Sequence, residues 1–98
     1  MNVATYTIMF QENEQPWLEY VYVKEASTAL NGAAFKLYIY FSSFSNESEI
    51  VFSPSKYIKE FGGGLTSARR AFEELVEKKY LTLINNNTFL FSRLTKMD

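Results

Sequence analysis

The chain has 98 residues, 47% of them hydrophobic and 17% aromatic, which predicts one folded domain with a modest core and excludes a disordered tail. It contains neither cysteine nor histidine, so disulfides, cysteine-ligated metals and catalysis by either residue are excluded, and a reducing cytoplasm is the expected location. The formal net charge is −1, so the chain as a whole lacks a basic excess.

Two β-strands are expected near the N-terminus. Residues 3–10 are rich in strand formers and alternate in polarity, residues 17–23 have a similar composition, and the polar stretch 11–16 separates them. We expect these strands to pair as a hairpin. The aromatic residues of the second strand either cover the core or form a dimer surface, because aromatic side chains are enriched in interface cores; they are Trp17, Tyr20 and Tyr22.

A helix is expected over residues 32–44, with Asn31 as its N-cap. Apolar residues recur at helical spacing and also fill the flanks, so this helix should be central and largely buried. These residues are Ala34, Phe35, Leu37, Tyr38, Ile39, Tyr40 and Phe41. The same aromatic run leaves a strand as the alternative. After a polar loop, a short strand at 50–52 is expected to join a later hairpin as its third strand.

Residues 54–61 are predicted to form a short helix. Ser53 suits its N-cap and Pro54 its first turn, while Tyr57, Ile58 and Phe61 supply an apolar face. Three glycines, residues 62–64, then end the helix, because glycine adopts positive φ at little steric cost. A turn of about three or four residues containing glycine is typical of a helix-turn-helix.

A longer helix over residues 66–79 follows, with Thr66 as the expected N-cap. One side is mostly apolar and is expected to face the core: Leu65, Ala68, Phe72, Leu75, Val76 and Lys79. The opposite side is polar: Thr66, Ser67, Arg70, Glu74 and Glu77, with Arg69 and Glu73 on a flank. Pairs of opposite charge at i,i+4 spacing support the helix; they are Arg69–Glu73, Arg70–Glu74 and Glu74–Lys78.

After Tyr80 the hydrophobic period changes from 3.6 to 2. Strands are predicted at 81–84 and 88–92, with the three asparagines 85–87 as the turn between them. The complete order predicts an α+β fold: a winged helix-turn-helix with three helices, a small antiparallel wing sheet and an N-terminal β-hairpin. Within one domain spanning 1–98, residues 1–24 would hold the N-terminal strands, 25–92 the winged-helix core and 93–98 a tail.

Three segments carry a resemblance to a known group of proteins: Ala34–Tyr38, Ser53–Phe61 and Ser67–Leu81. Their order resembles the winged-helix domains of phage and plasmid proteins, including replication initiators and DnaD-like replisome organisers. The resemblance covers about residues 20–92. Those proteins often have glycine where Lys79 stands, and they usually continue into a second domain.

The charges are distributed unevenly along the chain. Residues 1–52 carry a net charge of −4 and residues 53–98 one of +3, so the half with the helix-turn-helix pattern is basic. In a helix-turn-helix the longer second helix is presented to DNA, where arginine can bind guanine and hydroxyls bind phosphates or bases. The candidate DNA-binding residues are Lys56, Lys59, Thr66, Ser67, Arg69, Arg70, Lys78, Asn86 and Arg93. The alternative is that these arginines do not contact DNA and form ion pairs only with Glu73 and Glu74 along the helix.

No enzyme active site is expected, since the glutamates lie in a loop or on a solvated helix face and no Gly-Lys-Ser/Thr follows the glycine turn. No cofactor, metal or membrane span is expected either. The first functional hypothesis is a DNA-binding regulator or accessory replication factor of a phage or plasmid. Its partner would be double-stranded DNA, with a homodimer as an option. The alternative is a winged helix that binds protein, such as a small phage-type inhibitor of a host or rival machine.

Overall fold

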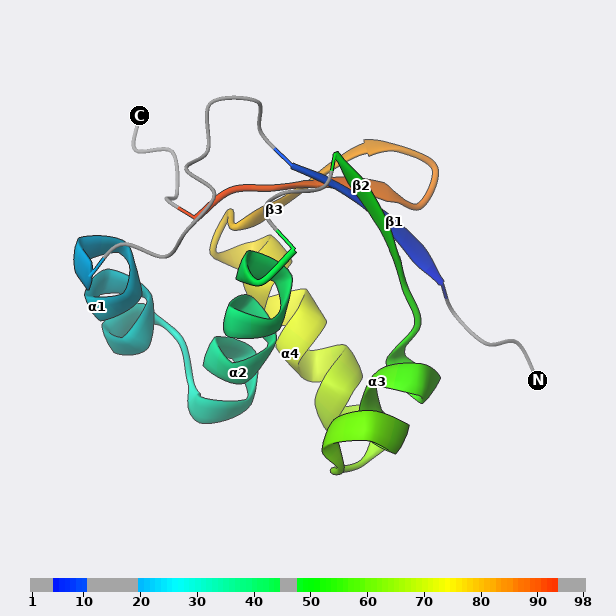
Figure 1. Cartoon of the computed structure of the whole chain (residues 1–98), viewed down its shortest axis with the longest axis horizontal. Helices are drawn as coiled ribbons and strands as arrows, with labels where there is room; N and C mark the ends of the chain where they lie inside the picture. The colour runs from blue at the N-terminus through cyan, green and yellow to red at the C-terminus, as the bar shows by residue number, and fades with distance from the viewer. Residues whose placement is uncertain (1–4, 11–19, 45–47, 94–98) are drawn as a thin grey trace.

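The structure is a computed structural model that describes residues 5–10, 20–44 and 48–93. These residues form an α+β fold in which the helices lie on one side of a four-stranded sheet (Figure 1). The elements in chain order are β1 (Tyr6–Phe10), α1 (Tyr20–Ala29), α2 (Gly32–Ser42), β2 (Glu49–Phe52), α3 (Pro54–Phe61), α4 (Leu65–Glu77), β3 (Leu81–Asn85) and β4 (Thr88–Phe91).

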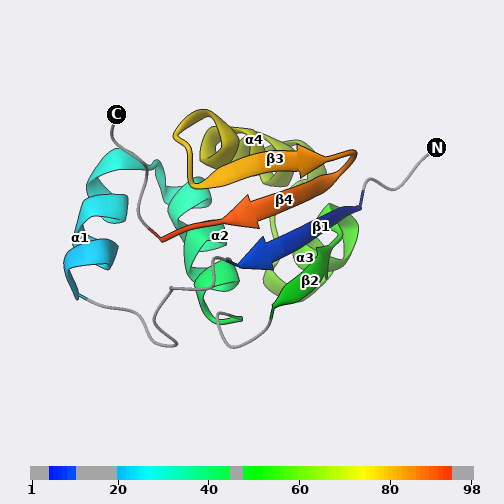
Figure 2. The same cartoon turned by 90° about the horizontal axis from the view of Figure 1, so that it is seen from above.

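The sheet has the strand order β2-β1-β4-β3, which Figure 2 shows from above. Strand β1 pairs antiparallel with β2, placing Ile8 opposite Ile50, and parallel with β4, placing Ile8 opposite Phe89. Strands β3 and β4 form an antiparallel hairpin. The prediction that β2 would join this hairpin directly was therefore wrong, because β1 lies between them.

The predicted N-terminal β-hairpin was also wrong. Its first strand exists as β1, but residues 20–23 belong to helix α1, while residues 17–19 lie outside the described part. Val23 is half-buried, and Ala26 and Leu30 are buried. This spacing is helical, so one side of α1 packs inward despite the strand-forming residues at its start.

Aromatic side chains dominate the core between the sheet and the helices. Phe72 of α4 has its ring 4.2 Å from that of Tyr6, 5.6 Å from that of Phe52 and 5.0 Å from that of Phe89. Phe41 of α2 is fully buried in the same cluster. The helical prediction for the aromatic run is confirmed, since this run lies in helix α2.

The starts of α2 and α3 confirm the predicted caps. The side chain of Asn31 accepts a hydrogen bond from the backbone N–H of Ala34, and that of Ser53 accepts one from Lys56. The start of α4 differs from its prediction. Gly64 is the N-cap, in an extended conformation and without a side-chain cap, so Thr66 already lies inside the first turn.

The glycine turn and the end of α4 both use left-handed backbone. Gly62 and Gly63 have φ of 87° and 91°, as the turn prediction requires. Lys79 has φ of 74°. The N–H of Tyr80 donates to the carbonyl of Leu75, which makes the end of α4 a Schellman motif. Lys79 thus occupies the position at which similar helices often have glycine.

Candidate nucleic-acid interface

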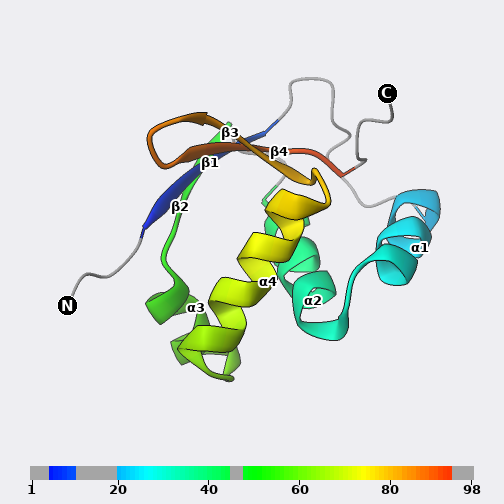
Figure 3. The same cartoon turned by 180° about the vertical axis from the view of Figure 1, so that it is seen from behind.

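The candidate interface is the exposed surface of α3, the glycine turn and the first half of α4. Figure 3 shows α4 flanked by α3 and α2 below the sheet. Six of the predicted site residues lie on this surface with exposed side chains: Lys56, Lys59, Thr66, Ser67, Arg69 and Arg70. They come from two helices that the glycine turn holds in contact.

Helix α4 has a buried side and a charged side. Its buried residues are Ala68, Ala71, Phe72 and Leu75. At 100° per residue, the middle of the opposite side carries Thr66, Arg70, Glu73 and Glu77, and all four are exposed. The charge therefore divides along the helix: hydroxyls and arginines occupy its first half, while its carboxylates lie in the second half. Only the first half suits an anionic partner.

The second half of α4 is tied to the start of α2. The two carboxylate oxygens of Glu74 accept hydrogen bonds from Asn31, one from its backbone N–H at 2.9 Å and one from its side-chain amide at 2.6 Å. Lys78, one turn later, donates its Nζ to the carbonyl of Ala29 at 3.3 Å. Glu74 and Lys78 thus have structural partners across helices. The contact between Glu74 and Asn31 could not be predicted from the sequence, since no local spacing connects residues 43 positions apart.

The β3–β4 hairpin offers amides and hydroxyls instead of charges. No residue from Leu81 to Ser92 is charged. Asn86 lies at the turn with φ of 48° and an exposed side chain, so its predicted role in the turn is confirmed. Asn87 beside it donates its side-chain amide to the carbonyl of Thr5 at 2.8 Å. Of the turn asparagines, Asn86 is therefore the better placed to contact a partner.

Arg93 does not fit its predicted role as a phosphate contact. Only 1% of its surface is exposed, and its backbone carbonyl accepts a hydrogen bond from the Tyr38 hydroxyl at 3.0 Å. A side chain so deeply buried cannot reach a phosphate outside the domain. The sequence places Arg93 directly after a strand, where solvent exposure is the usual expectation, and its contact with Tyr38 joins distant residues and leaves no local signal.

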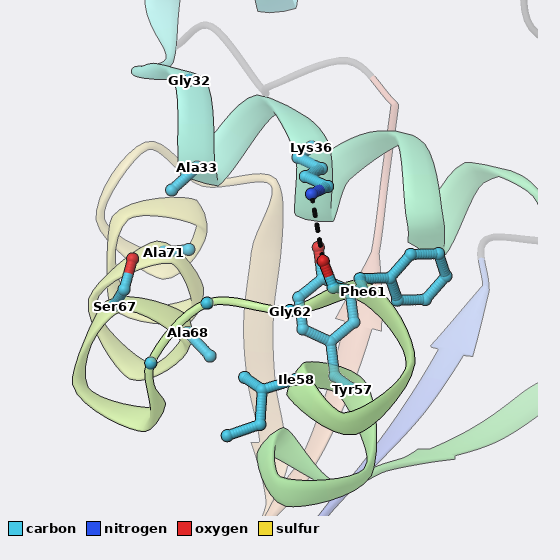
Figure 4. Close-up of a pocket in the computed structure, with 12 residues that line it drawn as sticks. Gly32, Ala33, Lys36, Tyr57, Ile58, Phe61, Gly62, Ser67, Ala68 and Ala71 are labelled. Carbon is cyan, nitrogen blue, oxygen red and sulfur yellow. Dashed lines mark hydrogen bonds between the residues drawn. The ribbon is translucent and has the colours of Figure 1, made fainter.

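A groove lies beside the candidate interface, between α2, α3 and the glycine turn (Figure 4). One part has a volume of about 270 Å³ and is lined mostly by small residues, including Ala33, Ser67 and Ala68. Lys36 points across it and donates its Nζ to the carbonyl of Phe61 at 3.5 Å, as Figure 4 shows. This contact joins α2 to the last residue of α3, directly before the glycine turn.

The adjoining part of the groove, about 410 Å³, is aromatic and includes Tyr40 and Tyr57, whose rings are 5.0 Å apart. Burial raises the pKa of the Tyr40 hydroxyl, with a further contribution from the Glu60 carboxylate. Burial also raises the pKa of Tyr57, with a further contribution from Tyr40. Both phenols are therefore neutral well above physiological pH.

The predicted dimer surface lies largely outside the described residues: this holds for Trp17 and for the side chain of Tyr20, while Tyr22 is half-buried. Within the described ranges no cluster of acidic side chains is arranged to hold a metal ion. No helix of that part of the chain is long and apolar enough to cross a membrane.

Comparisons with protein families, curated proteins and solved structures found no match to this chain.

Proposed function

We propose that this chain is a winged helix-turn-helix protein that binds double-stranded DNA, with α4 entering the major groove and the β3–β4 hairpin acting as the wing. In biological terms it would serve as a regulator or accessory replication factor of a phage or plasmid, as the resemblance implies. The observation that supports DNA binding most strongly is the surface around the glycine turn, where Thr66, Ser67, Arg69 and Arg70 are all exposed on the first half of α4.

The division of charge on α4 determines how it would enter DNA. Helix-turn-helix proteins contact base edges with the N-terminal residues of their recognition helix. In this chain that end carries Arg70, whose guanidinium can bind O6 and N7 of guanine together. Glu73 and Glu77 would then remain outside the groove, where phosphates do not repel them as strongly. Deep insertion of the whole helix is incompatible with these carboxylates.

Helix α3 would supply contacts with the DNA backbone. Lys56 and Lys59 are exposed on it, on the other side of the glycine turn from α4. Each lysine that neutralises a phosphate releases counterions and makes binding more dependent on salt. The wing would add only a polar contact through Asn86, because the hairpin has no charged residue.

Salt-titrated binding to DNA tests the proposal. The wild type is titrated with a duplex selected from a random pool and with a scrambled duplex, at several salt concentrations. Lys59→Ala should weaken binding to both duplexes alike and reduce the slope of log K against log [salt] by about one unit. Lys24→Ala is the matched control, since it removes the same charge from α1, an exposed site remote from α3. Absence of binding to any duplex at low salt would refute DNA binding.

A second candidate function is protein binding, and one observation favours it. Glu73 and Glu77 lie in the middle of the exposed side of α4, and the hairpin beside it is uncharged. A surface that combines carboxylates with an uncharged hairpin fits a protein partner better than it fits the phosphate backbone of DNA. In that case the wild type would fail to bind heparin or DNA, and Arg70 would be an anchor for the partner, because arginine is enriched among residues that dominate interface energies.

A further inference from the structure

Strand β3 forms one edge of the sheet, and among the described residues no strand lies beside its outer side. Four of its residues are exposed: Thr82, Leu83, Ile84 and Asn85. Leu83 is 55% exposed and Ile84 50% exposed, which is high for large apolar side chains. Within the described part of the chain, the edge strand therefore presents both apolar surface and backbone groups without a strand partner.

The backbone groups on the open side of β3 can be identified from the hairpin. The N–H of Ser92 donates to the carbonyl of Tyr80 at 2.9 Å, so the pair Tyr80–Ser92 is hydrogen-bonded. In an antiparallel pair such bonding alternates, so Thr82 is the next residue bonded to β4. The N–H and C=O of Leu81 and Leu83 consequently point away from β4, toward the open side.

Soluble proteins usually protect such edges with charged side chains, proline or a covering segment. Strand β3 contains neither charge nor proline, and the whole hairpin from Leu81 to Ser92 is uncharged. The opposite edge differs, because β2 is shorter and begins with the exposed carboxylate of Glu49. The two edges are thus unequal, and β3 is the one open to pairing.

We propose that β3 pairs antiparallel with β3 of a second copy of this chain, which joins the two sheets into one. A two-fold axis through Thr82 would place Leu81 of one copy opposite Leu83 of the other, and this register pairs every outward N–H and C=O of these leucines. Thr82 would face Thr82, a favourable cross-strand pair. The occupant is a second copy because the register is self-complementary and an uncharged strand brings no repulsion when it meets itself.

An introduced cysteine tests this register directly. The chain has no cysteine, so the thiol of Thr82→Cys can form a disulfide only between copies. Residues facing each other in a non-hydrogen-bonded pair have Cα atoms about 4.5 Å apart, which lies within the range of about 4.4–6.8 Å that a disulfide spans. Under mild oxidation without DNA, Thr82→Cys should become a covalent dimer. The control Val51→Cys, on the other edge, should form little disulfide-linked dimer under the same conditions.

Sedimentation equilibrium without DNA supplies the second measurement. The wild type should show twice the mass of one chain. Leu83→Pro and Leu83→Lys should show the mass of one chain with an unchanged circular dichroism spectrum, because the Leu83 N–H points away from β4. Val51→Lys, the matched control at a 65% exposed position, should stay dimeric. A monomeric wild type, or a dimer that survives both Leu83 variants, would overturn the proposal, whatever the DNA-binding result.

Discussion

Helices α2 and α4 pack against each other, yet they contribute to the molecule in different ways. Helix α2 has one charged residue, Lys36, and buries aromatic or aliphatic side chains around most of its circumference. Helix α4 buries one side, centred on Phe72 and Leu75, and exposes arginines and glutamates on the other. Changes in α2 should therefore act on folding alone, whereas changes in α4 should separate into those that affect folding and those that affect binding.

The largest expected effect is on the buried side of α4. Phe72→Ala removes a ring that contacts aromatic residues of three strands, and we expect it to lower the free energy of unfolding by about 3–5 kcal/mol. Urea denaturation measures this change. Phe61→Ala, which truncates a ring that is 43% exposed, should cost much less. Equal losses would mean that the buried and exposed sides of these helices have been misassigned.

On the exposed side, Arg70→Ala should leave stability within about 0.5 kcal/mol of the wild type while weakening DNA binding. If Arg70 binds a guanine, the loss on a selected duplex should be about 1–3 kcal/mol, with relaxed preference at one base pair. Titration of Arg70→Ala with duplexes changed at single positions measures both. An equal loss on every duplex would instead assign Arg70 to a phosphate.

The contact between the two helices should give a smaller effect. Asn31→Ala removes both the cap of α2 and the side-chain hydrogen bond to Glu74, and should cost about 1–2 kcal/mol of stability. A double-mutant cycle with Glu74→Ala should show a coupling above about 0.5 kcal/mol. Glu77→Ala is the control partner, and its effect should simply add to that of Asn31→Ala.

The smallest effect concerns Tyr40 of α2, in the groove between α2 and α3, at high pH. The pKa of Tyr40 is raised in the folded state above its ordinary value of 10.0. The folded protein thus holds this proton where the unfolded chain releases it, so stability is unaffected below pH 10 and falls as pH rises above it. Tyr40→Phe should make this alkaline decline less steep in thermal unfolding measured from pH 8 upward. An unchanged slope would exclude Tyr40 as its source.

The segment from Ser53 to the β3–β4 hairpin could be predicted from sequence because its signals are local. A capping serine before proline, a run of glycines and a change of hydrophobic period each act within a few residues. The exposed first half of α4 followed from the same periodicity. Glycine at the N-cap of α4 was missed because the hydroxyl of Thr66 can cap a helix, whereas Gly64 caps α4 without any side-chain hydrogen bond.

The remaining features depend on contacts between distant residues. The strand-forming residues at 20–23 are helical because packing of Ala26 and Leu30 outweighs their local preference. The backbone of Arg93 contacts Tyr38 of α2, 55 positions away, and the burial of Arg93 has no local signal in the sequence. The position of β1 in the sheet depends on its pairing with β2 and β4, which are both distant in the sequence. No pattern within residues 6–10 could therefore have indicated it.

The position of β1 bears on how the protein is assembled during synthesis. β1 is the first described strand to leave the ribosome, but its parallel partner β4 is the last. Within the described sheet, β1 also lies between β2 and the β3–β4 hairpin. The sheet therefore cannot close until nearly all of the described chain has been made. Helices α2, α3 and α4 can form earlier from local contacts. Their aromatic side chains then remain exposed to solvent until the sheet forms. A nascent chain in this state is a natural client for chaperones that bind exposed aromatic surface.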